Sequence, residues 1–232
     1  MSPNAETQSY DLELILLTRR LAAMAESGVP LSAILDTLQE EAPAHYADAL
    51  REISVQVWAN QSLYQGLAAY PALFPSVYCV MVRAAEVGGM LDTTLHALAD
   101  LLETDWKLTH LAGRPSLLTQ VDHENTPDFS LLTAAQRAVI LSLFCRTFGQ
   151  LLSSGVPILQ AMKVTADLLP VDARTEWLEI RRRFSVGASL GEVGFLPPFL
   201  RRLVEIAERD GTLDSVMLTA ADTYAREVTC RR

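Results

Sequence analysis

The chain has 232 residues, of which 50% are hydrophobic, so it can bury the core of one or two domains and is not a disordered protein. Its 19 basic and 28 acidic residues give a net charge of −9 at pH 7, which disfavours binding to nucleic acids and to anionic lipid surfaces. The three cysteines are far apart and odd in number, which argues against a disulfide framework and indicates reduced thiols in the cytoplasm.

The N-terminal residues 1–13 lack the basic start and the apolar run of a secretory signal. The most apolar stretches, residues 14–17 and 138–144, are soon followed by charged residues and fall short of the ~20 apolar residues that span a bilayer. The sequence therefore predicts no export and no integral membrane span.

Apolar residues with helical spacing indicate an all-α fold with six helices in the first half of the chain. Gly28 stands at the end of the first helix, because glycine adopts the left-handed C′ conformation cheaply, and Pro30 can open the second helix. In the same way Gly88 or Gly89 ends the fifth helix, and the Asp92 carboxylate can accept the free amides at the start of the sixth. We expect the six helices near residues 10–27, 31–41, 43–59, 62–70, 75–87 and 92–111.

The second half of the chain repeats the first at an offset of 127 residues. The Ser-Gly-Val-Pro sequence of residues 27–30 recurs with Gly155 and Pro157, and Arg146 corresponds to Arg19. Agreement without a gap over this distance indicates an internal duplication. The second copy should therefore contain the same helices from about residue 130 to residue 229.

Towards the end of each copy the offset falls to 122 residues. It then matches Glu208, Gly211 and Asp214 to Glu86, Gly89 and Asp92. A deletion explains the change, because seven residues separate Ser189 from Pro197 where twelve separate Ser62 from Pro75. We therefore expect only a stub in place of the fourth helix of the second copy.

The predicted architecture is two tandem six-helix antiparallel bundles, because short loops between helices imply antiparallel neighbours. Residues 1–113 form the first bundle and residues 130–232 the second. Residues 114–129 contain several Pro, Asp and Asn residues without sustained periodicity, so they are expected to be a linker.

Several short motifs recur in the same order in both copies. The first copy has L-x-x-x-A-x-S-G-V-P-L at residues 21–31, then Ser-Leu at 62–63, Phe-Pro at 74–75 and A-E-V-G-G-M-L at 85–91. The second copy has G-V-P at 155–157, G-A-S-L at 187–190 and A-E-R-D-G-T-L at 207–213. This pattern resembles the protein F family of type II secretion systems and type IV pili, and each copy resembles one cytoplasmic F domain.

The resemblance implies a cytoplasmic six-helix bundle that is part of an inner-membrane platform and contacts the secretion or pilus assembly ATPase or other platform proteins. No catalysis is attributed to that family. Typical members have transmembrane helices between the two copies and after the second, and these helices are missing here. The chain is then either a soluble paralogue or a reduced platform, in the cytoplasm or peripheral at the inner face of the inner membrane.

Two functions follow as hypotheses. The first is a non-enzymatic scaffold or adaptor of a type II secretion or type IV pilus-like machine. The alternative is a free-standing soluble helical regulator, or a degenerate paralogue, without a role in the machine. Neither involves nucleic acid, and a homo-oligomer is left open.

The sequence gives little support for catalytic or cofactor chemistry. The four histidines do not lie at metal-ligand spacing, and no phosphate-binding loop of the GxxxxGK[ST] type occurs, so we expect no metal, no cofactor and no nucleotide hydrolysis. Residues 187–191 match the GxSxG pattern of hydrolases, but no strand is predicted before Ser189 and every histidine precedes it. Ser189 is better explained as a helix cap.

Charged residues in two places are candidate partner contacts. Glu86 and Glu208 each precede a helix-ending glycine by three residues. Each is a solvated carboxylate, an acceptor of backbone hydrogen bonds at the turn after its helix, or a contact with a basic partner surface. As exposed residues they should tolerate charge reversal with little loss of thermal stability. Arg181 and Arg182 belong to a basic run that is either a solvated helix face or a contact with an acidic partner. The three tryptophans are expected to be core anchors: Trp58, Trp106 and Trp177.

Overall fold

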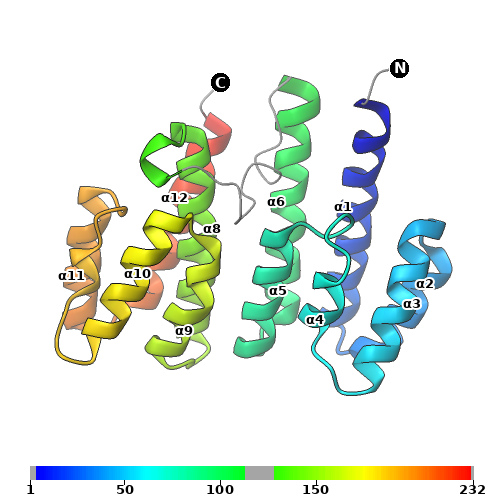
Figure 1. Ribbon diagram of the computed structural model, residues 1–232, viewed down its shortest axis with the longest axis horizontal. Helices are drawn as coiled ribbons and strands as arrows, with labels where there is room; N and C mark the ends of the chain where they lie inside the picture. The colour runs from blue at the N-terminus through cyan, green and yellow to red at the C-terminus, as the bar shows by residue number, and fades with distance from the viewer. Residues whose placement is uncertain (1–3, 113–127, 231–232) are drawn as a thin grey trace. The chain divides into compact units, whose positions relative to one another are not determined.

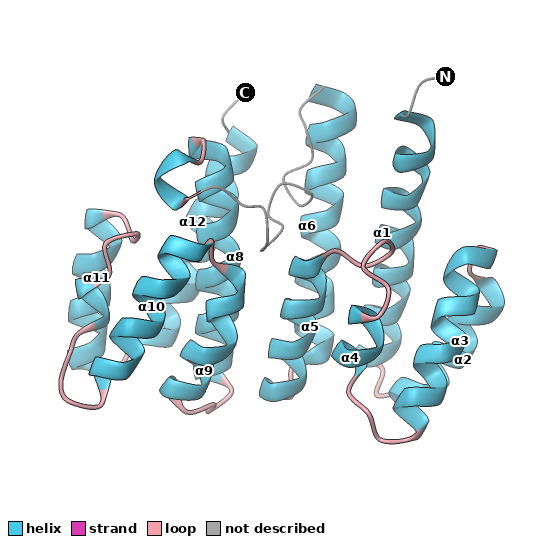
Figure 2. Ribbon diagram, viewed as in Figure 1, coloured by secondary structure: helices cyan, strands magenta, loops and turns pink. Residues whose placement is uncertain are grey.

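The computed structural model describes residues 4–112 and 128–230, and it divides the chain into two compact units, Met1–Thr119 and Gln120–Arg232. Every regular element within the described residues is a helix (Figure 2). This confirms the predicted all-α class. Most of the predicted linker, residues 114–129, lies outside the described residues.

The described part of the first unit, residues 4–112, contains six helices (Figure 1). The first helix lies along the last, the second packs on the third, and the fourth packs on the fifth. These helices are α1 (Asn4–Glu26), α2 (Leu31–Glu41), α3 (Ala44–Trp58), α4 (Leu63–Ala68), α5 (Ser76–Gly88) and α6 (Leu91–Ala112).

The second unit repeats this order, and α12 lies along α8 as α6 lies along α1. The fourth helix is reduced to a single 3₁₀ turn, which confirms the stub expected from the deletion. The elements are η1 (Phe129–Leu131), α8 (Ala134–Ser153), α9 (Ile158–Thr165), η2 (Ala166–Leu168), α10 (Val171–Phe184), η3 (Leu190–Glu192), α11 (Pro198–Asp210) and α12 (Leu213–Cys230).

Glycine and proline set the helix boundaries in both copies. Gly28, Gly89, Gly155 and Gly211 have φ of 75°, 66°, 78° and 69°, the left-handed conformation expected at helix C-termini. Prolines occupy the N-cap position of six helices, where a missing amide hydrogen has no cost. They form three matched pairs, of which the sequence comparison found the first and third: Pro30 and Pro157, Pro43 and Pro170, Pro75 and Pro197.

The predicted capping by Asp92 and Asp214 is wrong in detail. α6 and α12 begin at Leu91 and Leu213, so both aspartates lie inside the first turn and are not the N-cap residues. A carboxylate in this position is still favoured by the partial positive charge at the helix N-terminus.

The core of each bundle is centred on aromatic rings. In the first unit the Phe74 ring lies between those of Tyr46 and Tyr78, with centroids 5.9 and 5.7 Å away. In the second unit Trp177 makes edge contacts with the rings of Phe144 and Phe148, at 4.9 and 5.3 Å. Such contacts stabilise a core beyond the area that they bury.

Of the three tryptophans predicted to lie in the core, only one is fully buried. Trp177 is buried, and its Nε1 donates a hydrogen bond to the Met162 carbonyl at 3.0 Å. Trp106 is half-buried. Trp58 is 66% exposed, so its prediction is wrong, because the end of α3 lies at the surface and the indole nitrogen donates to Asp36.

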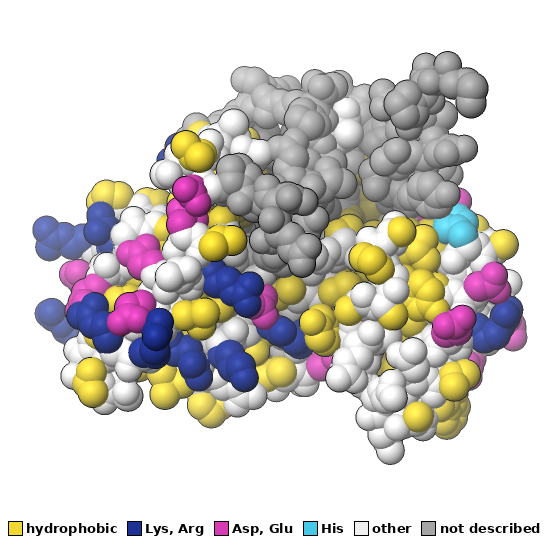
Figure 3. Space-filling view, in the orientation of Figure 1, with side chains coloured by type: hydrophobic (Ala, Val, Ile, Leu, Met, Phe, Trp, Pro, Cys, Tyr) yellow, Lys and Arg dark blue, Asp and Glu magenta, His cyan; other side chains and the backbone are white. Residues whose placement is uncertain are grey.

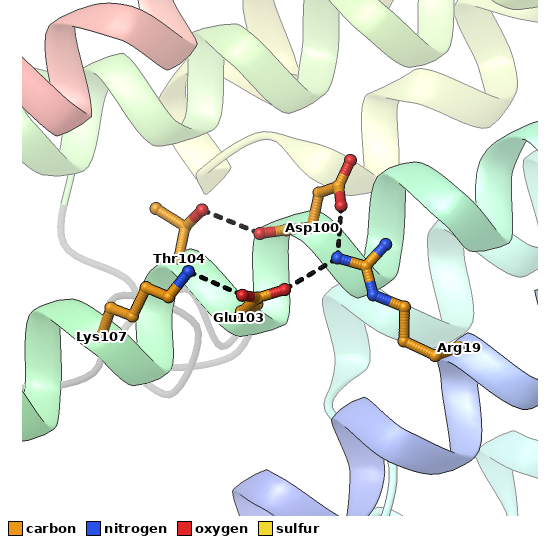
Figure 4. Close-up of polar contacts among 5 residues, drawn as sticks. All are labelled: Arg19, Asp100, Glu103, Thr104 and Lys107. Carbon is orange, nitrogen blue, oxygen red and sulfur yellow. Dashed lines mark hydrogen bonds and ion pairs between the residues drawn. The ribbon is translucent and has the colours of Figure 1, made fainter.

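An ion pair joins the first and last helices of each copy. Arg19 of α1 binds Asp100 and Glu103 of α6 through Nη2, at 2.6 and 2.8 Å, and Lys107 also binds Glu103 (Figure 4). Arg146 of α8 binds Asp222 of α12 at 2.8 Å, and these residues correspond to Arg19 and Asp100. The duplication has therefore kept a charged contact between segments far apart in sequence.

Substituting valine for Gly28 or Gly155 should lower the free energy of unfolding by about 1 kcal/mol or more, because a branched side chain at positive φ is strained. No atom lies within 4 Å of a Cβ added at either position, so strain is the expected cause rather than a clash. Urea unfolding measures the change. Asparagine, which tolerates this conformation, is the control and should cost less. Equal losses for valine and asparagine would contradict this explanation.

Replacing Glu103 with glutamine should lower the melting temperature at pH 7 but not at roughly pH 3. Hydrogen bonds from Lys107 and Arg19 hold the pKa of Glu103 below its ordinary value. A lowered pKa in the folded state gives stability that is present above the unfolded pKa of ~4.3 and is lost as the pH falls through the folded value. Thermal melts of both variants across this range test the effect. Glu40, an exposed glutamate of α2, is the matched control, and Glu40→Gln should change neither melt.

Candidate functional site

The repeated glutamate of the first copy holds the start of a neighbouring helix. The Glu86 carboxylate, near the end of α5, accepts hydrogen bonds from the backbone amides of Leu63 at 2.5 Å and Tyr64 at 3.1 Å. These are among the first amides of α4, which have no partner within the helix. The Ser62 side chain accepts the next one, from Gln65. Glu86 therefore fixes α4 against α5.

The second copy has the same arrangement around its shortened element. The Glu208 carboxylate accepts from the Leu190 amide at 2.7 Å and from the Ser189 hydroxyl at 2.5 Å. The Ser189 hydroxyl oxygen in turn accepts from the Gly191 amide at 3.0 Å, so Ser189 is an N-cap, as expected. Five residues were lost between the copies, yet the bond between the glutamate and the helix start was retained.

Both glutamates are half-buried, which contradicts the exposure expected from the sequence. Their interpretation as acceptors of backbone hydrogen bonds is correct, although the amides belong to the fourth helix rather than to the corner that follows. The clue in the sequence was the joint recurrence of Ser-Leu and Glu in both copies. A contact with a partner stays a prediction, and charge reversal should now cost stability.

A surface hollow of about 390 Å³ lies beside the second corner. Glu208 and Asp214 contribute its carboxylates, and Leu152, Ile158 and Phe184 contribute apolar walls. The Asp214 carboxylate also accepts a hydrogen bond from the Ser153 hydroxyl at 3.2 Å. This corner therefore combines acidic and apolar groups at the surface.

The two arginines singled out in the sequence have different surroundings. Arg181 is half-buried, and its Nε donates to the Leu159 carbonyl at 2.7 Å, which ties α10 to α9. Arg182 is exposed and pairs with Glu179 one turn earlier, at 2.8 Å. Such a surface pair contributes little to stability, so Arg182 is the more available of the two for a partner.

The described histidines lie beside carboxylates rather than beside other metal-ligating side chains. Within the described residues no three His, Cys, Asp or Glu residues lie close enough to hold a metal ion. His45 and His96 instead face Glu13 and Glu26 at 3.0 and 3.1 Å, and the side chains of the other two histidines lie outside the described part. No described helix is both long and apolar enough to cross a membrane.

The fold and the glutamate contacts together define a class of protein with two tandem helical bundles. In each bundle an arginine forms an ion pair between the first and last helices, and a glutamate accepts a hydrogen bond from a backbone amide at the start of the fourth element. A family model described as "Type II secretion system (T2SS), protein F" matches residues 17–110 and, a second time, residues 144–232. The two matches cover most of the sequence, one in each bundle. The chain therefore belongs to the type II secretion system protein F family.

Curated relatives agree with this assignment. The chain is 26% identical to a type II secretion system protein F of Aeromonas hydrophila, over 93% of the chain and 76% of the relative. It is 22% identical to type IV pilus assembly proteins PilC of Myxococcus xanthus and Thermus thermophilus, over 93% of the chain and 71% and 73% of these relatives. The alignments extend over 296 and 298 positions, more than the chain's 232 residues, so the relatives contain segments without a counterpart here.

Replacing Glu86 or Glu208 with alanine should lower the free energy of unfolding by about 1–3 kcal/mol, because each loses hydrogen bonds to a charged acceptor. Asp92→Ala, which removes a first-turn charge and a long hydrogen bond from the Thr93 hydroxyl, should cost about 0.3–1 kcal/mol. Chemical unfolding measures both losses. Glu40→Ala on α2 controls for loss of an exposed carboxylate, and a loss at Glu86 no larger than at Glu40 would contradict the role assigned to the corner.

Proposed function

We propose that this chain is a non-enzymatic scaffold or adaptor of a type II secretion or type IV pilus-like machine, on the cytoplasmic side of the membrane. The observation that carries the proposal is the double match to protein F, one in each bundle. The named functions of the relatives, type II secretion and type IV pilus assembly, support the same setting. The proposed partners are the assembly ATPase or other proteins of the platform.

Charge suggests that the two copies meet different partner surfaces. Residues 4–112 contain five basic and fourteen acidic residues, whereas residues 128–230 contain eleven and twelve. Figure 3 shows Lys and Arg side chains gathered over the part of the second unit that contains α10 and α11. We propose that Arg181 and Arg182 contact an acidic surface. Complementary charges of this kind speed association and select the partner.

The repeated glutamates are also proposed contacts. Backbone amides occupy some of the roughly four lone-pair positions of each carboxylate, which leaves capacity for a basic group of a partner. Glu208 is the better placed of the two, because it lines the hollow that also contains Asp214.

A pull-down against the assembly ATPase of the same organism tests the proposal. Arg182→Glu should reduce retention about fivefold while leaving the melting temperature nearly unchanged, because Arg182 is exposed. Arg51→Glu is the matched control, since Arg51 is an equally exposed helical arginine with an acidic neighbour three residues away. The chain alone should hydrolyse no ATP.

Failure of the wild-type chain to bind the ATPase or any other platform protein would reject the scaffold function and favour the free-standing regulator. Equal retention of the Arg182 and Arg51 variants would reject the basic contact only.

A further inference from the structure

An open groove runs between α11 and α12 of the second unit, with a volume of about 700 Å³. Leu200 and Leu203 of α11 and Val216 and Ala220 of α12 form its apolar walls. The lining residues of α12 run from Ser215 to Glu227, which are twelve helical steps apart, so the groove is about 18 Å long at 1.5 Å per residue. Its length and lining suit an extended apolar ligand.

One end of the groove is charged. A second hollow of about 370 Å³ adjoins it at the start of α11 and shares Pro197, Tyr224 and Glu227 as lining residues. This hollow also contains Arg137 of α8 and Arg201 of α11. The two hollows together form one surface that is apolar along most of its length and cationic at one end.

The arginines at this end have unused binding capacity. Among the described residues neither Arg137 nor Arg201 forms an ion pair, and the buried Nε of Arg201 makes no hydrogen bond. Among the described residues that line this hollow, Glu227 is the one carboxylate, and the two guanidinium groups outnumber it by one positive charge. Burial raises the pKa of Tyr224 to about 12, so its hydroxyl stays protonated and can donate a hydrogen bond. A carboxylate is the ligand that these donors fit.

The first copy provides an internal comparison. At the offset of 122 residues, Cys79 and Leu102 correspond to Arg201 and Tyr224. Both first-copy residues are buried, and the Cys79 thiol donates to the Phe74 carbonyl in its own bundle. The repeat therefore does not need an arginine at this position to fold. The polar end of the groove is a feature of the second copy.

We propose that this groove binds an amphipathic helix of a partner protein, with the apolar face of the helix along α11 and α12 and a carboxylate at one end on Arg137 and Arg201. Binding of a helix in an apolar groove is a common mode of peptide recognition. This proposal assigns a binding site to the scaffold function proposed above. It rests on that function only because it requires a protein partner.

The openness of the groove favours a helix over a small amphiphile. Thr219 and Thr223, which line it, are exposed, and Phe199 at its rim is 75% exposed. Small-molecule sites usually bury 70–90% of their ligand. A fatty acid in this groove would remain largely in water, whereas a helix needs only one face covered.

Two synthetic helical peptides of about 14 residues, long enough to fill the groove, test the proposal with the full chain. Both have leucines on one face and an amidated C-terminus, and the last turn contains two glutamates in one peptide and two glutamines in the other. Fluorescence polarisation should show about tenfold tighter binding of the glutamate peptide. The double variant Arg137→Gln/Arg201→Gln should remove that difference. Arg202→Gln, on an exposed arginine of α11 outside the groove, should keep it.

A second variant tests the apolar part. Thr219→Trp should fill the groove and abolish binding of both peptides. Thr175→Trp is the matched control, because Thr175 is an exposed threonine of α10 whose hydroxyl, like that of Thr219, donates to the carbonyl four residues earlier.

Several outcomes would overturn the proposal: no binding of either peptide, equal affinity of the two peptides, or binding of dodecanoate in place of the peptides. Peptide binding together with a failed ATPase pull-down would leave the groove assignment intact and reject only the proposed machine partner. A successful ATPase pull-down without peptide binding would reject the groove assignment alone.

Discussion

Each bundle depends on the packing of its first helix along its last. α1 meets α6, and α8 meets α12, although about 60 residues separate the end of the first helix from the start of the last in each copy. Closing a chain segment of this length costs conformational entropy, which the buried apolar area of the long helices must offset. The pairs of Arg19 with Asp100 and of Arg146 with Asp222 lie on these same interfaces. Because surface ion pairs contribute little energy, these pairs add to the apolar packing of the two helices and do not replace it.

The helices between the first and the last are positioned by contacts at their own ends. Proline at the N-cap and glycine at the C-terminus set where helices begin and end, and Glu86 and Glu208 attach the short fourth element to the fifth helix. The second copy lost most of the fourth helix and kept this attachment. A carboxylate on free amides needs only one turn of helix, so it survives a deletion that removes the rest.

Duplication left two bundles of one topology with different surfaces. Cys79 and Leu102 lie in the core of the first copy, whereas Arg201 and Tyr224 at the same positions in the second line the hollow that adjoins the groove. A repeat of this kind can keep its framework in both copies and reserve one copy for binding. Membership of the protein F family gives the setting for such a division. Arg201, Tyr224 and the arginines of α10 are among the positions where the second copy differs from the first.

The sequence alone determined the class, the duplication, most helix boundaries and the stub of the fourth helix, because periodicity, glycine at positive φ and proline at helix starts are local signals. Tertiary structure decided the rest. The roles of Glu86 and Glu208 depend on amides about 20 residues away, and Trp58 is exposed because α3 ends at the surface. The hollow that contains Arg137 and Arg201, beside the groove, joins α8, α11 and α12, which only the folded chain brings together. Local spacing cannot report such contacts, since they depend on which helix faces are left uncovered once the first and last helices have packed.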